Sequence, residues 1–124
     1  PGVHYLVFSV NDRRFVSTVD RVNEQLREGP TVYRYLCDDG LPGREGGFFI
    51  CASWLVEAFV RLGRVDEARE LFEQMDALAG PTGLLPEQYD PREKRTLGNH
   101  PQAYSHIGII RNALTLDRFV GGDA

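Results

Sequence analysis

The sequence predicts an all-α fold of about four helices arranged in two hairpins. Apolar residues recur at three- and four-residue spacing in four segments, and glycine- and proline-rich stretches separate these segments. The segments also alternate twice between an amphipathic helix and a helix that is apolar nearly all round. In that order one helix of each hairpin faces outward and the other inward, as in a double ring of helices or a plain helical bundle.

The first predicted helix runs from about Asp12 to Glu28, where its apolar residues form one stripe and Gly29-Pro30 ends it. The next stretch, Thr31 to Leu36, alternates and is rich in β-branched and aromatic residues, which predicts a short strand or an extended loop. Asp38 to Gly47 is a loop by composition.

The second predicted helix runs from about Phe48 to Leu62 and is followed by Gly63. Because it is apolar nearly all round, we expect it to be buried on most sides. Trp54 and Phe59 are therefore expected in the core.

The third predicted helix, Val65 to Ala79, has a single apolar stripe and ends at Gly80-Pro81. Its other face is charged. We interpret Asp66, Glu67 and Glu70 as a solvated face and not as a pair of catalytic carboxylates.

A second long loop, Thr82 to Pro101, precedes the fourth predicted helix, Gln102 to Arg118, which is again mostly apolar. Each long loop thus lies just before an inward-facing helix, and sites are often built at such positions. Two hairpins cannot bury both sides of such apolar helices. Either the helices form a compact bundle, or something else covers them, and the chain is then a fragment or an oligomer.

The composition is that of an ordinary globular domain. Of 124 residues, 42% are hydrophobic and 26% are charged, which argues against disorder and fits one domain over residues 1–124. The net charge of −4 and the scattered basic residues argue against nucleic acid as a partner. The apolar stretch Tyr5 to Val10 is too short to span a membrane and lacks the flanks of a signal peptide, so a cytoplasmic protein is expected.

The cysteines and histidines give no sign of a scaffold or a metal centre. Cys37 and Cys51 are too few for a disulfide framework, and Cys51 lies in an apolar run, so a reduced thiol is favoured over a bridge between the two. His100 and His106 have no third ligand at suitable spacing, which argues against a metal site. His106 is expected to be a hydrogen-bonded helix residue.

Two neighbouring segments resemble glycoside hydrolase family 15, which includes glucoamylases, glucodextranases and some bacterial and archaeal trehalases. They are Gly83 to Pro91, with Glu87-Gln88-Tyr89-Asp90, and Leu97 to His106. Upstream stretches agree in the same order: Tyr33-Arg34-Tyr35, Asp39-Gly40-Leu41-Pro42, Glu45-Gly46-Gly47-Phe48 and Trp54-Leu55-Val56-Glu57-Ala58. The likeness covers roughly Asp12 to Asn112.

The resemblance implies an (α/α)6 toroid of twelve helices, of which this chain is the last third. It implies hydrolysis of α-glucosidic bonds with inversion, with Glu87 as the general base that activates water and with no cofactor. The family's general acid lies upstream, in a part that this chain does not contain. An inverting enzyme needs both carboxyl groups, about 6.5–9.5 Å apart, so we expect the isolated chain to be inactive.

The resemblance also suggests substrate contacts. Arg34 matches an arginine that hydrogen-bonds sugar hydroxyls, for which a planar fork of donors is suited. Glu45 and Phe48 are expected to line the pocket, and Tyr89 and Tyr104 to pack against sugar faces or to fix the loop.

Three interpretations stay open. The chain is part of a full-length hydrolase, or a separate helical module that binds sugar or self-associates without turnover, or one of three copies that close a twelve-helix ring. In the first, the substrate is an α-linked glucosyl di- or oligosaccharide, whether maltose-like, dextran-like or trehalose.

Overall fold

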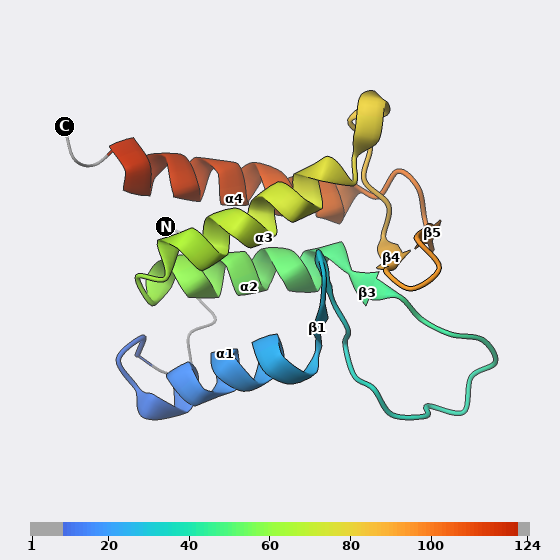
Figure 1. Ribbon diagram of the computed structural model, residues 1–124, viewed down its shortest axis with the longest axis horizontal. Coiled ribbons are helices and arrows are strands. Elements are labelled where there is room, and N and C mark those ends of the chain that lie inside the picture. The colour runs from blue at the N-terminus through green and yellow to red at the C-terminus, as the bar shows by residue number, and fades with distance from the viewer. Residues whose placement is uncertain (1–8, 122–124) are drawn as a thin grey trace.

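The computed structural model describes residues 9–121, so most of the stretch Tyr5 to Val10 lies outside the described residues. Within 9–121 the main elements are helices that lie alongside one another, with short strands gathered at one end of them (Figure 1). The helices are α1 (Arg13–Gln25), α2 (Phe49–Arg61), α3 (Val65–Ala77) and α4 (Ala103–Gly121), with a 3-10 turn η1 (Gly80–Thr82). The strands are β1 (Arg27–Glu28), β2 (Thr31–Val32), β3 (Gly47–Phe48), β4 (Gln88–Asp90) and β5 (Arg95–Leu97).

The predicted helices are all present, with ends that differ by a few residues. Helix α1 begins after Asp12, whose carboxylate accepts a hydrogen bond from the N–H of Arg14 at 2.8 Å and so caps the helix. It ends three residues before the predicted Glu28. The reason is that Arg27 and Glu28 turn about Gly29, at φ +60°, and pair with β2.

The all-α prediction is incomplete, because residues 9–121 also form an antiparallel sheet in the order β1-β2-β3-β4-β5. Its strands are two or three residues long and come from distant parts of the chain: Val32 pairs with Phe48, and Phe48 with Gln88. The close approach of the backbone before β3 to that of β4 requires a glycine at position 46. A Cβ at Gly46 would come 2.5 Å from the carbonyl oxygen of Tyr89.

The loop predicted from Thr82 to Pro101 contains part of this sheet, as the hairpin of β4 and β5. Asp90 shapes its turn: its carboxylate accepts hydrogen bonds from the N–H groups of Arg92 at 2.9 Å and Glu93 at 3.2 Å. Of the predicted extended stretch Thr31 to Leu36, only Thr31–Val32 is a strand.

The core lies around α2, which packs against both α3 and α4. Phe59 is fully buried, as predicted, and the stripe of α3 covers α2 through Ala68, Leu71 and Met75. Burying a side chain of the size of Phe or Leu stabilises the fold by about 1.5–3 kcal/mol. On the other face of α3, Asp66 is exposed as predicted.

That outer face is not uniformly solvated. Glu70 is exposed, but Glu67 is half-buried and accepts a hydrogen bond from Arg64 at 2.7 Å. Arg64 also bonds to Asp20, so it joins α3 to α1.

The prediction that Trp54 of α2 lies in the core is wrong, because its side chain is 62% exposed. On the neighbouring α4, three large apolar side chains are also more than half exposed: Ile107, Ile110 and Leu114. The physical reason is that composition marks a helix as apolar without saying which of its sides has a neighbour. We call these four residues the open apolar face.

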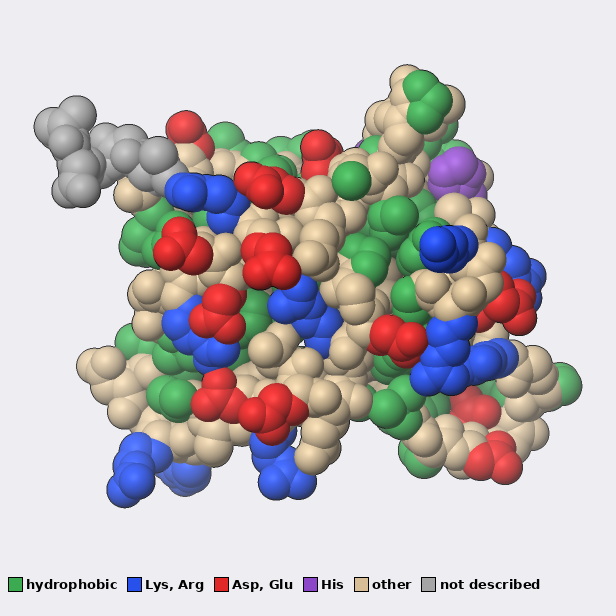
Figure 2. All heavy atoms as spheres, viewed as in Figure 1, with side chains coloured by type: hydrophobic (Ala, Val, Ile, Leu, Met, Phe, Trp, Pro, Cys, Tyr) green, Lys and Arg blue, Asp and Glu red, His purple; other side chains and the backbone are tan. Residues whose placement is uncertain are grey.

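The surface charges are mixed (Figure 2), and the two cysteines are not bridged. On the side shown in Figure 2, basic and acidic side chains are intermingled. Cys37 and Cys51 are free thiols, and burial raises the pKa of Cys51. Among residues 9–121, no helix is both long enough and apolar enough to cross a bilayer.

Candidate functional site

The two long loops meet where β3 pairs with β4, at the N-terminal ends of α2 and α4 (Figure 1). The N–H of Phe49, the first residue of α2, donates to the carbonyl oxygen of Glu87 at 3.3 Å. Short strands thus fix the position of Glu87 beside the start of α2.

The Glu87 carboxylate is half-buried and accepts hydrogen bonds at both oxygens. The backbone N–H of Asn99 lies 3.0 Å from Oε2, and the side-chain Nδ2 of the same residue lies 3.1 Å from it. The hydroxyl of Tyr104 donates to Oε1 at 2.8 Å. Hydrogen bonds to the charged form favour it.

These contacts lower the pKa of Glu87 below its ordinary value. The backbone hydrogen bond from Asn99 has the largest effect, followed by the hydroxyl of Tyr104. Desolvation opposes them, while the Asn99 side chain and the positive charge of Arg34 act in the same direction as the first two. Glu87 is therefore held as a carboxylate at neutral pH.

The segment that carries Glu87 is attached to the first turn of α4 and the residues before it. Leu85 O accepts from the N–H of Gln102 at 2.9 Å, and the N–H of Glu87 donates to Asn99 O at 2.8 Å. The buried hydroxyl of Ser105 donates to Pro86 O at 2.8 Å.

His106 completes this attachment and is a hydrogen-bonded helix residue, as predicted. Its Nε2 accepts from the N–H of Leu85 at 3.2 Å, and its Nδ1 lies 2.7 Å from Gln102 O. Because Nε2 is the acceptor, Nδ1 carries the proton and donates to that carbonyl.

Arg34, Glu45 and Phe48 form a second group on the other loop. Arg34 and Glu45 form an ion pair through Nη2 and Oε1, and Arg34 Nε lies 3.3 Å from Glu45 Oε2. The Arg34 guanidinium lies 4.7 Å from the ring centre of Phe48. The hydrogen bond to Glu45 raises the pKa of Arg34, which therefore carries a fixed positive charge.

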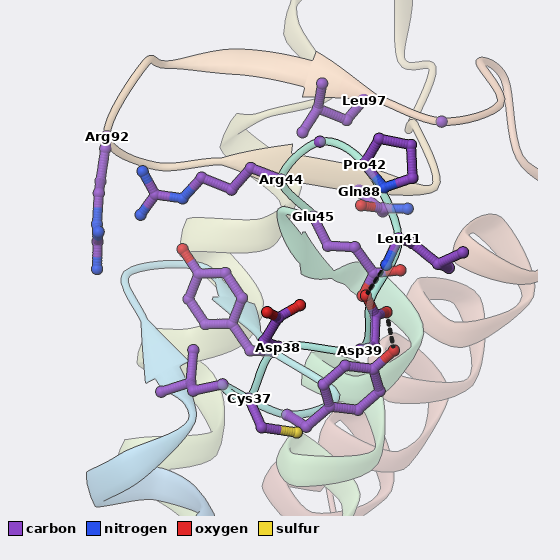
Figure 3. A pocket seen from close by; sticks show the side chains of 15 residues that line it. Cys37, Asp38, Asp39, Leu41, Pro42, Arg44, Glu45, Gln88, Arg92 and Leu97 are labelled. Atoms are coloured by element: carbon purple, nitrogen blue, oxygen red, sulfur yellow. Dashed lines mark hydrogen bonds between the residues drawn. The ribbon is translucent and has the colours of Figure 1, made fainter.

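A cavity of about 720 Å³ opens between this loop and the β4–β5 hairpin. Figure 3 shows Asp38, Asp39 and Glu45 on the loop side and Gln88 and Leu97 on the hairpin side. The volume is within the range of small-molecule sites. The wall includes further polar side chains and glycine: Tyr33, Tyr35, Arg44, Arg92 and Gly98.

The cavity and the Glu87 carboxylate are neighbours through Gly98. Gly98 lines the cavity, and a Cβ at that position would lie 2.6 Å from Glu87 Oε2. Glu45 lines the cavity, whereas Arg34 and Phe48 are not among its wall residues. Arg34 contacts both Glu45 and the Phe48 ring.

The two predicted tyrosines differ. Tyr104 hydrogen-bonds Glu87, whereas Tyr89 is half-buried in β4 and packs against the core. A role for Tyr89 in sugar binding stays a prediction. Among residues 9–121, no three metal-ligating side chains lie together.

Sequence reasoning missed Asn99 as a partner of Glu87 and missed several wall residues of the cavity. Asn99 is twelve positions from Glu87, and only the turn at Gly98 brings its two donors to the carboxylate. The glycine itself is the sequence signal that points to this turn, since a backbone at φ +71° favours a residue without Cβ.

Comparison with known proteins identifies the family of the chain. The sequence profile described as Glycosyl hydrolases family 15 matches residues 2–114. The chain is 42% identical over 103 residues to a trehalase of Mycolicibacterium smegmatis, which covers 81% of this chain and 15% of that protein. It is 39% identical over 108 residues to a trehalase of Thermoplasma volcanium, which covers 86% of this chain and 17% of that protein.

A trehalase of Mycobacterium tuberculosis is 43% identical over 103 residues, with the same coverage as its M. smegmatis counterpart. The chain spans only 15–17% of the length of these three relatives. No solved structure matches it significantly. Because the family profile covers nearly all of its length, the chain belongs to glycosyl hydrolase family 15.

Proposed function

We propose that the chain supplies the general base of an inverting hydrolase of α-glucosidic bonds, and that Glu87 is this base. The observation that carries the proposal is the set of hydrogen bonds from Asn99 and Tyr104 to both oxygens of the Glu87 carboxylate, next to the cavity. A base must be ionised to accept a proton from water. Glu87 meets this condition at neutral pH, as any ordinary glutamate does, and its lowered pKa keeps it ionised at lower pH as well.

The general acid comes from another part of the catalytic domain. In this proposal no residue of this chain acts as the general acid, and the chain alone releases no glucose. The matched relatives are about six to seven times longer than the aligned segment, which leaves ample chain for the acid.

The substrate in this proposal is trehalose or another α-linked glucosyl disaccharide. The relatives described above are all named trehalases. Hydroxyl-rich sugars suit the polar cavity wall that includes Glu45, Asp38 and Gln88. Glu45 and the Phe48 ring hold Arg34 in place, and its guanidinium has further N–H groups that can donate to a sugar hydroxyl.

The architecture in this proposal is the last third of an (α/α)6 toroid, with α2 and α4 in the inner ring. The open apolar face supports it, since Trp54, Ile107, Ile110 and Leu114 are each more than half exposed. Further helices of the same domain would cover these side chains.

The same face favours a second candidate, a helical module that associates with copies of itself and has no turnover. A patch of large apolar side chains on two neighbouring helices is typical of an interface. In that case native mass measurements would show an oligomer, and Glu87 would have no catalytic role.

The deciding experiment grafts the matched segment of this chain into the M. smegmatis trehalase in place of its counterpart. We expect the chimaera to hydrolyse trehalose. ¹H NMR of the first product should show one of the two glucose units released as the β-anomer, because inversion changes the configuration at the attacked carbon.

Two variants of the chimaera identify the base. Glu87→Gln should lower kcat by about a hundred- to ten-thousandfold, the usual contribution of general base catalysis. Glu93→Gln is the matched control, since Glu93 is exposed on the adjacent hairpin and, among the described residues, its side chain bonds only to Arg95. Equal activity of the two variants would contradict the proposal.

A further inference from the structure

The hydrogen bonds to Glu87 are unequally divided between its two oxygens. Among the donors of residues 9–121, Oε2 accepts two, the backbone N–H and the Nδ2 of Asn99, whereas Oε1 accepts one, the hydroxyl of Tyr104. A carboxylate has about four lone-pair sites, two on each oxygen. Both sites of Oε2 are therefore occupied, and Oε1 keeps one that is open to a further donor.

We propose that Asn99 and Tyr104 are positioning residues that orient Glu87 so that Oε1 is the atom that takes the proton from water. This inference rests on the proposed function of Glu87 as the base. Asn99 fixes the oxygen that does not react. Tyr104 fixes the direction of the free lone pair on the oxygen that does.

The reaction step balances without any further group on this chain. An O–H bond of water breaks, its proton goes to Oε1, and the water oxygen bonds to the anomeric carbon. The bond from that carbon to the leaving oxygen breaks with its electron pair, and the leaving oxygen takes a proton from a carboxylic acid on another part of the domain. Glu87 ends the step as a neutral carboxylic acid.

Gly98 is required for this arrangement. Its φ of +71° directs Asn99 toward the carboxylate, and a Cβ there would lie 2.6 Å from Oε2 and 3.0 Å from the Glu87 Cβ. No real side chain tolerates the first distance, so a larger residue must displace either Glu87 or the turn. The added methyl group would occupy the space in which Asn99 approaches Oε2.

The attachment of Tyr104 gives its hydroxyl a fixed position. Tyr104 precedes the fully buried Ser105, whose hydroxyl bonds to Pro86 O in the segment that carries Glu87. Both ends of the Tyr104–Glu87 contact therefore belong to one anchored unit. Burial, and next the bond to Glu87, raises the pKa of Tyr104, so its hydroxyl keeps its proton and remains a donor at neutral pH and above it.

The first test is a pH titration of the Glu87 side-chain carboxyl by ¹³C NMR in the 124-residue chain, with an ¹H–¹⁵N spectrum to verify the fold of each variant. We expect the pKa of Glu87 to rise in Gly98→Ala, Tyr104→Phe and Asn99→Ala. The rise should decrease in that order. Gly98→Ala removes both Asn99 donors, whereas Asn99→Ala removes the side-chain donor alone and keeps the stronger backbone one.

Gly83→Ala is the matched control for Gly98→Ala. Gly83 has nearly the same backbone angle, φ +67°, but a Cβ there meets nothing within 4 Å. Both substitutions strain the backbone, and only Gly98→Ala should change the Glu87 titration. An unchanged Glu87 titration in all three test variants, with the fold retained, overturns the inference.

The second test uses the chimaera and is independent of whether the isolated chain folds. Tyr104→Phe should move the acidic limb of the kcat/KM profile to higher pH, because Glu87 then takes up its proton at a higher pH. Gly98→Ala should lower kcat by up to about a hundredfold, the loss that a base displaced by about 1 Å can cause. Gly83→Ala should leave both the pH profile of kcat/KM and the value of kcat unchanged.

The outcomes separate the two proposals. If Glu87→Gln abolishes activity while Tyr104→Phe and Gly98→Ala leave the profile and kcat unchanged, Glu87 is the base and the positioning inference is wrong. If the titration shifts as expected but Glu87→Gln keeps full activity, the hydrogen-bond arrangement is real and the proposed function is wrong.

Discussion

The two loops that precede α2 and α4 are built differently, although each is rich in glycine and charge. The loop before α2, residues 34–46, is exposed over most of its length, and most of its hydrogen bonds join exposed groups. The exception is at its end, where the N–H of the buried Gly46 donates to Gln88 Oε1 at 3.0 Å. Asp38 accepts from the N–H of Gly40 at 2.8 Å, and Asp39 accepts from the N–H of Leu41 at 3.0 Å and from the Tyr35 hydroxyl at 2.7 Å. Hydrogen bonds between residues close in sequence therefore stabilise the turns of this loop.

The loop before α4 is instead anchored to the protein interior. Leu85 and Pro86 are buried, Ser105 bonds to Pro86 O, and His106 and Gln102 bond to the backbone of Leu85. The part of the site that needs a precisely placed atom, Glu87, lies on this anchored loop. The part that forms the wall of a cavity lies on the exposed one.

This contrast fits the roles that we propose for the two loops. A general base gains from a fixed geometry, because small displacements of a reacting group are costly. A cavity wall can adjust to its ligand, and exposed loops with few buried contacts open at low free energy. Matched substitutions in the two loops test this difference.

The largest contrast is expected for one leucine in each loop. Leu85→Ala should destabilise the chain by about 2–5 kcal/mol, because Leu85 is 1% exposed and its loss leaves a cavity. Leu41→Ala should change the free energy of unfolding by no more than about 0.5 kcal/mol, because Leu41 is 69% exposed. Urea unfolding of the two variants measures this, and equal effects would show that the loops are anchored alike.

The next contrast concerns hydroxyl groups. Ser105→Ala leaves the buried carbonyl of Pro86 without its donor and should cost about 1–3 kcal/mol. Tyr35→Phe removes an exposed bond to Asp39 and should leave the urea midpoint unchanged. A midpoint shift for Tyr35→Phe as large as that for Ser105→Ala would contradict the account of a self-supported loop.

Acid pH should reveal the contribution of Glu87. Since its pKa is lower in the folded chain than in the unfolded chain, the stabilisation is fully present above the ordinary pKa of glutamate, about 4.3. It is lost as the pH falls below that value through the folded pKa. Glu87→Gln should therefore weaken the loss of stability in acid, as followed by thermal unfolding from neutral pH downward.

Asp39, in the loop before α2, should make a smaller contribution than Glu87 to the loss of stability in acid. Its pKa is also lowered, first by the Tyr35 hydroxyl and then by the N–H of Leu41, but these groups are exposed. Asp39→Asn should change the acid dependence less than Glu87→Gln does. The reverse order would indicate that the exposed loop contributes more to the charge-dependent stability.

The helices could be predicted from the sequence because their apolar residues repeat locally, as the stripe Ala68, Leu71 and Met75 of α3 shows. The sheet could not, because its strands are too short to show alternation and pair residues such as Phe48 and Gln88, which are forty positions apart. The exposure of Trp54 was also missed, because periodicity shows that a helix is apolar without identifying its neighbours.

The site was predictable in part for similar reasons. Glu87 was found through the family motif, and Tyr104 through the same segment, although its contact with Glu87 depends on how α4 begins. The pairing of Arg34 with Glu45 and the two donors of Asn99 arise from loop conformations. Local sequence does not fix such conformations.

The most direct test of the central claim compares one carboxylate from each loop in the chimaera. Glu87→Gln should lower kcat for trehalose by about a hundred- to ten-thousandfold with little change in KM, because it removes an interaction made only in the transition state. Glu45→Gln should chiefly raise KM, because Glu45 lines the cavity and holds Arg34. A Glu87→Gln enzyme that keeps its kcat would contradict the assignment of the base to the anchored loop.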